Sequence, residues 1–65
     1  MSNLDEKQTF LKAYSNVPIN LRNDIIVVIE GKPMTWNVAF IEVSNNSELG
    51  NRILSVLVEI GILKG

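Results

Sequence analysis

The chain has 65 residues, with no cysteine or histidine and with six basic residues against seven acidic ones. A chain this short forms one domain at most, and it buries only about 60% of the surface that its unfolded form exposes. Without cysteine and histidine, neither a disulfide nor an ordinary zinc site can add stability. A dense apolar core or self-association must supply it instead, and the 46% content of hydrophobic residues suits both.

The net charge of −1 is distributed along the chain without a basic tract, which disfavours binding to nucleic acid or to anionic lipid. The N-terminal residues are polar and acidic, unlike those of a secretory signal. The longest apolar run, residues 25–29, is far shorter than the roughly 20 residues that span a bilayer. We therefore expect a cytoplasmic protein with no membrane partner and no cofactor.

The first predicted element is a helix over residues 3–16. Asn3 is suited to the N-cap position, and Glu6 follows three residues later as in a capping box. Pro18 disfavours helical geometry at the residue before it, which ends the helix. The apolar residues at the spacing of one helical face are Leu4, Phe10, Leu11, Ala13, Tyr14 and Val17.

A polar connector follows over residues 18–24, rich in the asparagine and aspartate that turns prefer. We expect its two apolar side chains, Ile19 and Leu21, to tuck under the domain as local anchors. Asp24 is expected to cap the turn before the first strand. Arg22 could receive an anion, although a single arginine in a polar loop is usually only solvated.

Two apolar runs on either side of Gly31 and Lys32 predict an antiparallel hairpin. The first run, residues 25–29, consists wholly of β-branched residues, which suit strands. The second covers residues 34–43. A glycine-led pair between two such runs predicts a type II′ turn centred on Gly31 and Lys32.

This turn places Ile29 opposite Met34 in the predicted register, with Val27 opposite Trp36. The second strand does not keep its alternation, because apolar residues change from even to odd positions along it. Either a bulge near residues 38–40 or burial of both faces at that end would explain the change.

The last predicted element is a helix over residues 46–60, with Asn45 as its N-cap and Gly61 just past its C-terminus. Gly50 lies near its start, where the missing side chain would allow close packing. Residues 62–65 either add a short third strand or pack down. The order is thus α-β-β-α. It predicts an α+β fold in which an antiparallel hairpin packs against two helices, as a single domain over residues 1–65.

The last helix carries more apolar surface than one core stripe needs. Beside an ordinary stripe, Leu54 and Val58 form a second one. Either the first helix covers this second stripe, or the stripe contacts another chain. For the chain as a whole we favour self-association, because exposed apolar patches mark interfaces and most homo-oligomers are two-fold dimers.

No pattern in the sequence supports catalysis. Histidine and cysteine are absent, and no glycine-rich phosphate-binding motif occurs. Glu42 is expected at a strand edge, facing water or paired with a lysine or arginine. Trp36 beside Asn37 could stack on a ligand ring, but a tryptophan in a small domain more often anchors the core.

Three functions follow from these patterns. The favoured one is a non-catalytic protein-interaction or scaffold module, homodimeric or with an unidentified protein partner, that uses Leu54, Val58, Trp36 and Asn37. A nucleic-acid-binding regulator acting through the sheet face or the last helix is the alternative. A small-ligand sensor with a site near Trp36 and Glu42 is a further one.

Overall fold

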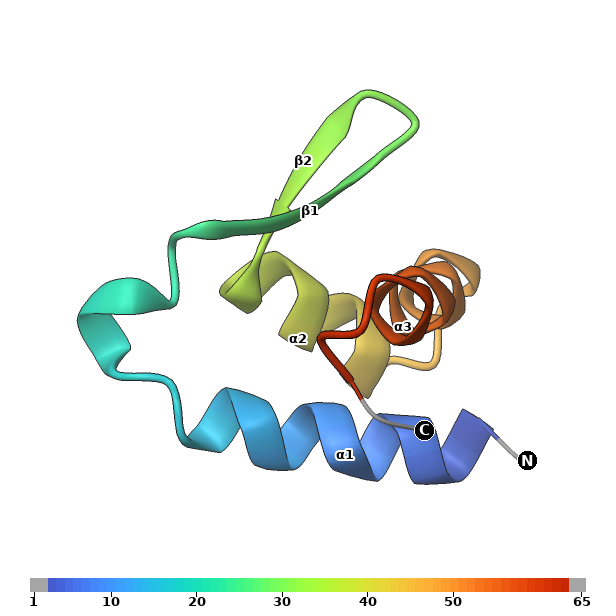
Figure 1. The fold of residues 1–65 in the computed structure, drawn as a ribbon, viewed down its shortest axis with the longest axis horizontal. Helices are drawn as coiled ribbons and strands as arrows, with labels where there is room; N and C mark the ends of the chain where they lie inside the picture. The colour runs from blue at the N-terminus through green and yellow to red at the C-terminus, as the bar shows by residue number, and fades with distance from the viewer. Residues whose placement is uncertain (1–2, 64–65) are drawn as a thin grey trace.

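The computed structural model describes residues 3–63, with side chains from residue 5 onward. Its elements are α1 (Asn3–Ser15), the 3-10 helix η1 (Ile19–Leu21), β1 (Ile25–Ile29), β2 (Lys32–Thr35), α2 (Trp36–Ser44) and α3 (Glu48–Glu59). The hairpin packs on α2 and α3, and α1 lies on the opposite side of these two helices (Figure 1). The predicted α+β fold, with a hairpin packed against helices, is confirmed, and residues 3–63 contain one α-helix more than predicted.

Helix α2 replaces most of the strand that was predicted over residues 34–43. Thr35 is extended and ends β2, and its Oγ1 accepts the backbone N–H of Val38 at 3.1 Å as an N-cap. The change of apolar phase along this segment is helical periodicity, since Ala39 and Val43 are buried while Val38 and Ile41 are exposed. Neither explanation expected for a strand, a bulge near residues 38–40 or burial of both faces, therefore applies.

The hairpin turn lies one residue earlier than predicted. Ile29 pairs with Lys32, so the two central residues are Glu30 and Gly31. Both have positive φ angles, 49° and 79°. Two left-handed central residues make a type I′ turn instead of the predicted type II′ turn.

The strand register slips by two residues as a consequence. Met34, predicted opposite Ile29, pairs with Val27. Because side chains alternate with a period of two, this slip leaves the same faces buried, and all three of these residues belong to the core. The ladder is irregular between Ile25 and Val27, so the bulge lies in the first strand and not in the second.

Helix α3 begins later than predicted, with Ser47 as its N-cap. The Ser47 Oγ accepts the backbone N–H of Gly50 at 2.9 Å, whereas Asn45 is the C-cap of α2. A Cβ on Gly50 would lie 2.3 Å from the backbone oxygen of Glu42. The close packing predicted at this glycine is therefore confirmed, and it sets how near the two helices approach.

The C-terminus of α3 ends at Gly61 as predicted, with a φ of 87°. The N–H of Gly61 donates to the Val58 carbonyl and that of Ile62 to the Leu57 carbonyl, which is a Schellman motif. Leu63 then packs into the core. Within the described residues the sheet has two strands, so the chain packs down here without a third strand.

One sequence prediction falls on side chains that the structure does not describe, and another is wrong. The N-cap of Asn3 and the apolar contact of Leu4 lie outside the described side chains. Ile19 and Leu21 are exposed by 80% and 44%, so the prediction that they anchor the connector is wrong. The reason is that η1 lies at the end of the molecule, away from the layer between the hairpin and α1 (Figure 1).

Candidate functional site

The predicted interaction stripe on the last helix lies largely inside the fold. Leu54 is 2% exposed and belongs to the core, and Val58 is half-buried against it. Helix α3 contacts α1, α2 and β1 within the same chain. Leu54 therefore offers almost no surface to a partner.

Trp36 is the first residue of α2, not a strand residue as predicted. Its ring lies 5.8 Å from that of Phe10, tilted by 32°, and it packs half-buried against the core. Its backbone N–H donates to the Asp24 carbonyl at 3.3 Å. This placement suits an anchor between α1 and the start of α2 better than a platform for a ligand ring.

Asn37 joins three segments through hydrogen bonds. Its Oδ1 accepts the hydroxyl of Tyr14 at 2.7 Å, and its Nδ2 donates to Oδ1 of Asn23 at 2.8 Å. Its backbone N–H donates to the Arg22 carbonyl at 3.0 Å. Both ends of the side-chain amide are thus engaged inside the fold, where they tie the connector and α1 to α2.

The N-terminus of α2 is not an anion site. A helix N-terminus binds anions through free backbone N–H groups. The first three such groups of α2, on Trp36, Asn37 and Val38, donate to the Asp24 carbonyl, the Arg22 carbonyl and Oγ1 of Thr35.

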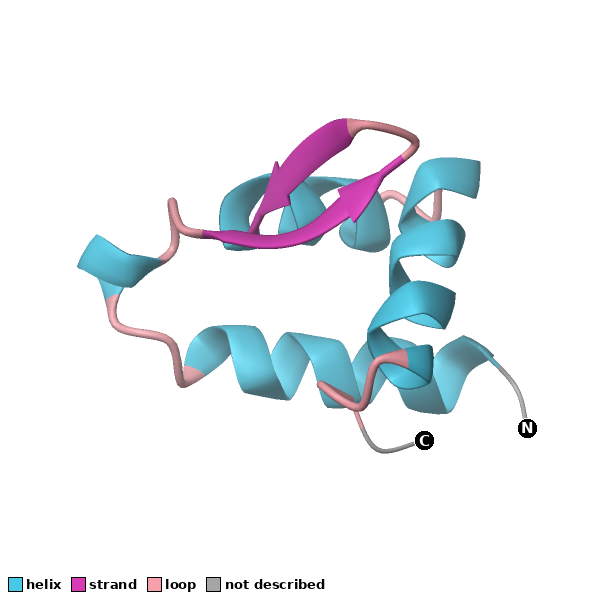
Figure 2. Cartoon of the chain, turned by 45° about the horizontal axis from the view of Figure 1, so that its top comes forward, coloured by secondary structure: helices cyan, strands magenta, loops and turns pink. Residues whose placement is uncertain are grey.

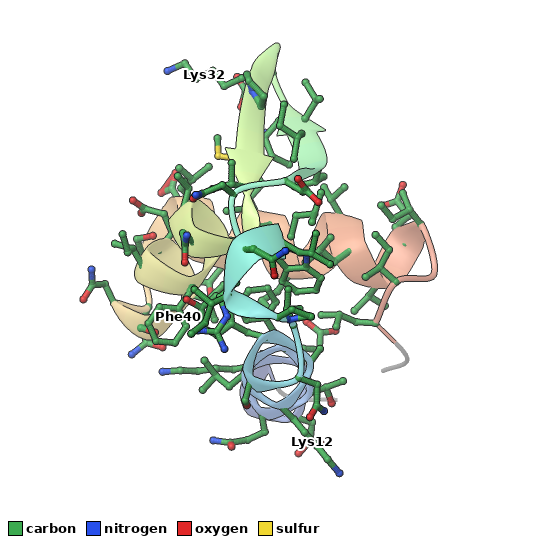
Figure 3. All side chains as sticks on the ribbon, turned by 90° about the vertical axis from the view of Figure 1, so that its left-hand side faces the viewer. Lys12, Lys32 and Phe40 are labelled. Atoms are coloured by element: carbon green, nitrogen blue, oxygen red, sulfur yellow. The ribbon has the colours of Figure 1, made fainter. Side chains whose placement is uncertain are left out.

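Arg22 is also engaged within the chain. Its guanidinium lies 4.4 Å from the ring centre of Tyr14, and its Nε donates to the Val17 carbonyl at 3.0 Å. The Tyr14 ring stacks in turn on Phe40 of α2 at 4.4 Å. Figure 3 shows Phe40 in the layer between α2 and α1. These contacts of the Tyr14 ring, with a cation and with a second aromatic ring, hold the connector against the helices.

Glu42 does not meet Trp36. It lies half-buried near the C-terminus of α2, where its Oε1 accepts the Ser47 hydroxyl at 2.6 Å. It lies six positions after Trp36 in the helix, which is about 9 Å along the axis, and the two side chains leave different faces. The predicted pairing with a lysine or arginine is replaced by the serine contact, and the proposed ligand site between these residues is not assembled.

The hairpin has an outer face that carries exposed apolar side chains. Ile25 and Val28 of β1 are each 59% exposed, whereas the inner face of the hairpin packs on α2 and α3. Among residues 3–63 no helix or strand lies over the outer face (Figure 2). The other exposed large apolar residues are Ile19, Leu21, Val38, Ile41, Ile60 and Ile62.

The two edges of the hairpin differ in what they can bind. In a two-residue turn the pair Ile29–Lys32 exchanges hydrogen bonds, so the next pair, Val28–Pro33, does not. The backbone N–H and C=O of Val28 therefore point to the open edge of β1. On the other edge Pro33 has no N–H to offer and Lys32 adds a charge, and both features block strand pairing.

Electrostatic features are few. Arg52 of α3 and Glu30 of the turn form an ion pair, and both side chains are largely exposed. In the part of the chain that the structure describes, no group of three or more acidic residues could hold a metal ion. Between residues 3 and 63, no helix has the length and apolar character needed to cross a membrane.

The sequence pattern points to Leu54, Val58, Trp36 and Asn37 as the candidate surface, and it does not single out the edge of β1. Pro33 was a usable signal, because proline has no N–H and suits a strand position whose backbone groups point away from the partner strand. A turn centred on Glu30 and Gly31 puts Pro33 at such a position. The candidate surface is thus the open edge and outer face of β1. Comparison of the chain with family models, with curated proteins and with solved structures found no match.

Proposed function

We propose that this chain is a non-catalytic protein-interaction module that associates with itself as a homodimer through β1. One observation carries the proposal. Ile25 and Val28 each keep 59% of their surface exposed on a strand that has no neighbour beyond it within the described residues. Exposed apolar strand edges recruit further strands, and contiguous apolar patches mark protein interfaces.

The polar side chains of the fold support a non-catalytic role. Asn37, Glu42 and Tyr14 all use their hydrogen-bonding groups on other parts of the chain. Their contacts tie segments together, and none of them projects into a shared site. Chemistry on a substrate would require such groups to be free and convergent.

The proposed association is reversible, because the chain is already compact. Its accessible surface is 4260 Å², and a monomer of its mass, 7.3 kDa, is expected to have about 4,200 Å². We therefore expect the monomer to fold without a partner and the dimer to add stability by mass action. A cytoplasmic location remains part of the proposal.

Sedimentation equilibrium and thermal melts over a wide concentration range test this function. We expect the mean mass to move from one copy to two and the melting temperature to rise with concentration. A protein that stays monomeric at the highest concentration, with a melt independent of concentration, would refute self-association. An interaction module would then have to bind a different protein.

A further inference from the structure

On the open edge of β1, Val28 presents both its backbone N–H and its C=O outward. The N–H and the C=O of Val28 point away from β2 because Val28 and Pro33 form a non-hydrogen-bonded pair. A second strand that runs antiparallel and has its own Val28 at this point makes two reciprocal bonds. A two-fold axis through that point relates the two copies, as in most homodimers.

We infer that two copies join edge to edge, with β1 antiparallel to β1 of the second copy and the two Val28 residues at the centre of a four-stranded sheet. This inference rests on the self-association proposed above. It assigns the edge to a second copy because β1 supplies a matching strand, uncharged and β-branched over all five residues.

Charge specifies the register. Asp24 and Glu30 flank β1 at its two ends, and both are exposed. With the axis at Val28, Glu30 lies across from the second copy's Ile26. Moving the axis to Val27 would bring Asp24, beyond the bulge of β1, near the second copy's Glu30, and like charges that face each other destabilise a strand pair.

The end of α3 enlarges the interface. Helix α3 contacts β1 and ends on the side of its open edge (Figure 3). Two exposed apolar residues follow there, Ile60 at 55% and Ile62 at 46%. The two-fold axis places the second copy's α3 on the same, inner side of the four-stranded sheet. The apolar ends of the two helices then lie near each other on that side.

Interface size sets the expected strength. A stable interface covers about 800 Å² on each partner, which is about a fifth of the 4260 Å² on this chain. One edge of five residues is smaller than that. The helix ends must contribute, and the dimer is weak enough to dissociate on dilution.

Replacing Val28 by proline tests the edge directly. Val28→Pro removes the outward N–H, and the monomer should keep its fold because this N–H makes no hydrogen bond to β2. We expect association to weaken roughly 10- to 100-fold, as for the loss of two backbone hydrogen bonds. Sedimentation equilibrium measures this change, and circular dichroism checks the fold.

Two further variants complete the test. Val28→Lys places a charge on the edge and should weaken the dimer without proline. Ile41→Lys is the matched control, because Ile41 is 55% exposed on α2 and lies away from the edge. It should associate as the wild type does. Folded Val28 variants that dimerise like the wild type would overturn edge pairing while leaving self-association intact.

Amide hydrogen exchange in the wild type tests edge pairing even if both Val28 variants unfold. The Val28 N–H should exchange rapidly in dilute protein and become protected at concentrations where the dimer forms. Rapid exchange in the dimer would exclude edge pairing. A wild type without any dimer would remove the proposed function and this inference together.

Discussion

The hydroxyl of Tyr14 donates a hydrogen bond of 2.7 Å to Oδ1 of Asn37, which connects α1 to the first turn of α2. The two residues are separated by 23 positions in the chain. The ring of Tyr14 contacts both the Arg22 guanidinium and Phe40, so a single side chain joins the connector and two helices. Its hydroxyl and its ring can be tested separately.

Tyr14→Phe should lower the free energy of unfolding by about 1–2 kcal/mol. The ring contacts remain, while Oδ1 of Asn37 loses its donor in a half-buried place. Urea denaturation measures the change. A double-mutant cycle with Asn37→Ala should show coupling between the two positions, whereas additive effects would mean that the bond contributes nothing to stability.

Gly50→Ala should destabilise the protein, although alanine is the better residue in most helices. Its Cβ would lie 2.3 Å from the Glu42 carbonyl oxygen, which is backbone and cannot rotate away. Separation of α2 from α3 should cost about 1–3 kcal/mol or more. Ser55→Ala, an exposed change on the same helix, is the control and should not lower the melting temperature. A Gly50→Ala protein as stable as the wild type would show that α2 and α3 do not approach so closely.

Glu30→Asn should leave stability unchanged or raise it by up to about 1 kcal/mol. Glutamate at a φ of 49° is strained. Asparagine is favoured at this position of a type I′ turn. The substitution removes the ion pair with Arg52, but exposed pairs contribute only about 0–1 kcal/mol. Arg52→Gln isolates the ion pair, since it leaves the turn intact. A clear loss of stability in Glu30→Asn but not in Arg52→Gln would contradict the assignment of a type I′ turn.

Trp36→Ala should lower the free energy of unfolding by about 2–3 kcal/mol, measured by denaturation followed by circular dichroism. Truncation of a fully buried aromatic residue lowers the free energy of unfolding by about 3–5 kcal/mol. The expected loss is smaller here because Trp36 is only half-buried. Trp36→Phe should keep part of the contact with Phe10 and lose less. If Trp36→Ala were as stable as the wild type, the ring would be free for a partner and the anchor role would be wrong.

Local signals predicted the elements that depend on near neighbours in the chain. The β-branched run of residues 25–29 forms β1, and Gly61 ends α3 with a positive φ, as their conformational preferences require. Helix α2 was missed for a related reason. Its two valines and its isoleucine favour strands, and the signal that overrides them is the cap from Thr35, a residue that is also common in strands.

The sequence by itself determined which faces are apolar, and only the tertiary structure decided what covers them. Helical periodicity placed Leu54 and Val58 on one apolar stripe. Whether that stripe contacts a partner depends on the neighbouring elements, which place Leu54 in the core. Strand alternation likewise identified Val27 and Ile29 as one face. The open edge at Val28 depends instead on how many strands the sheet contains, and that number is set by contacts between residues far apart in the chain.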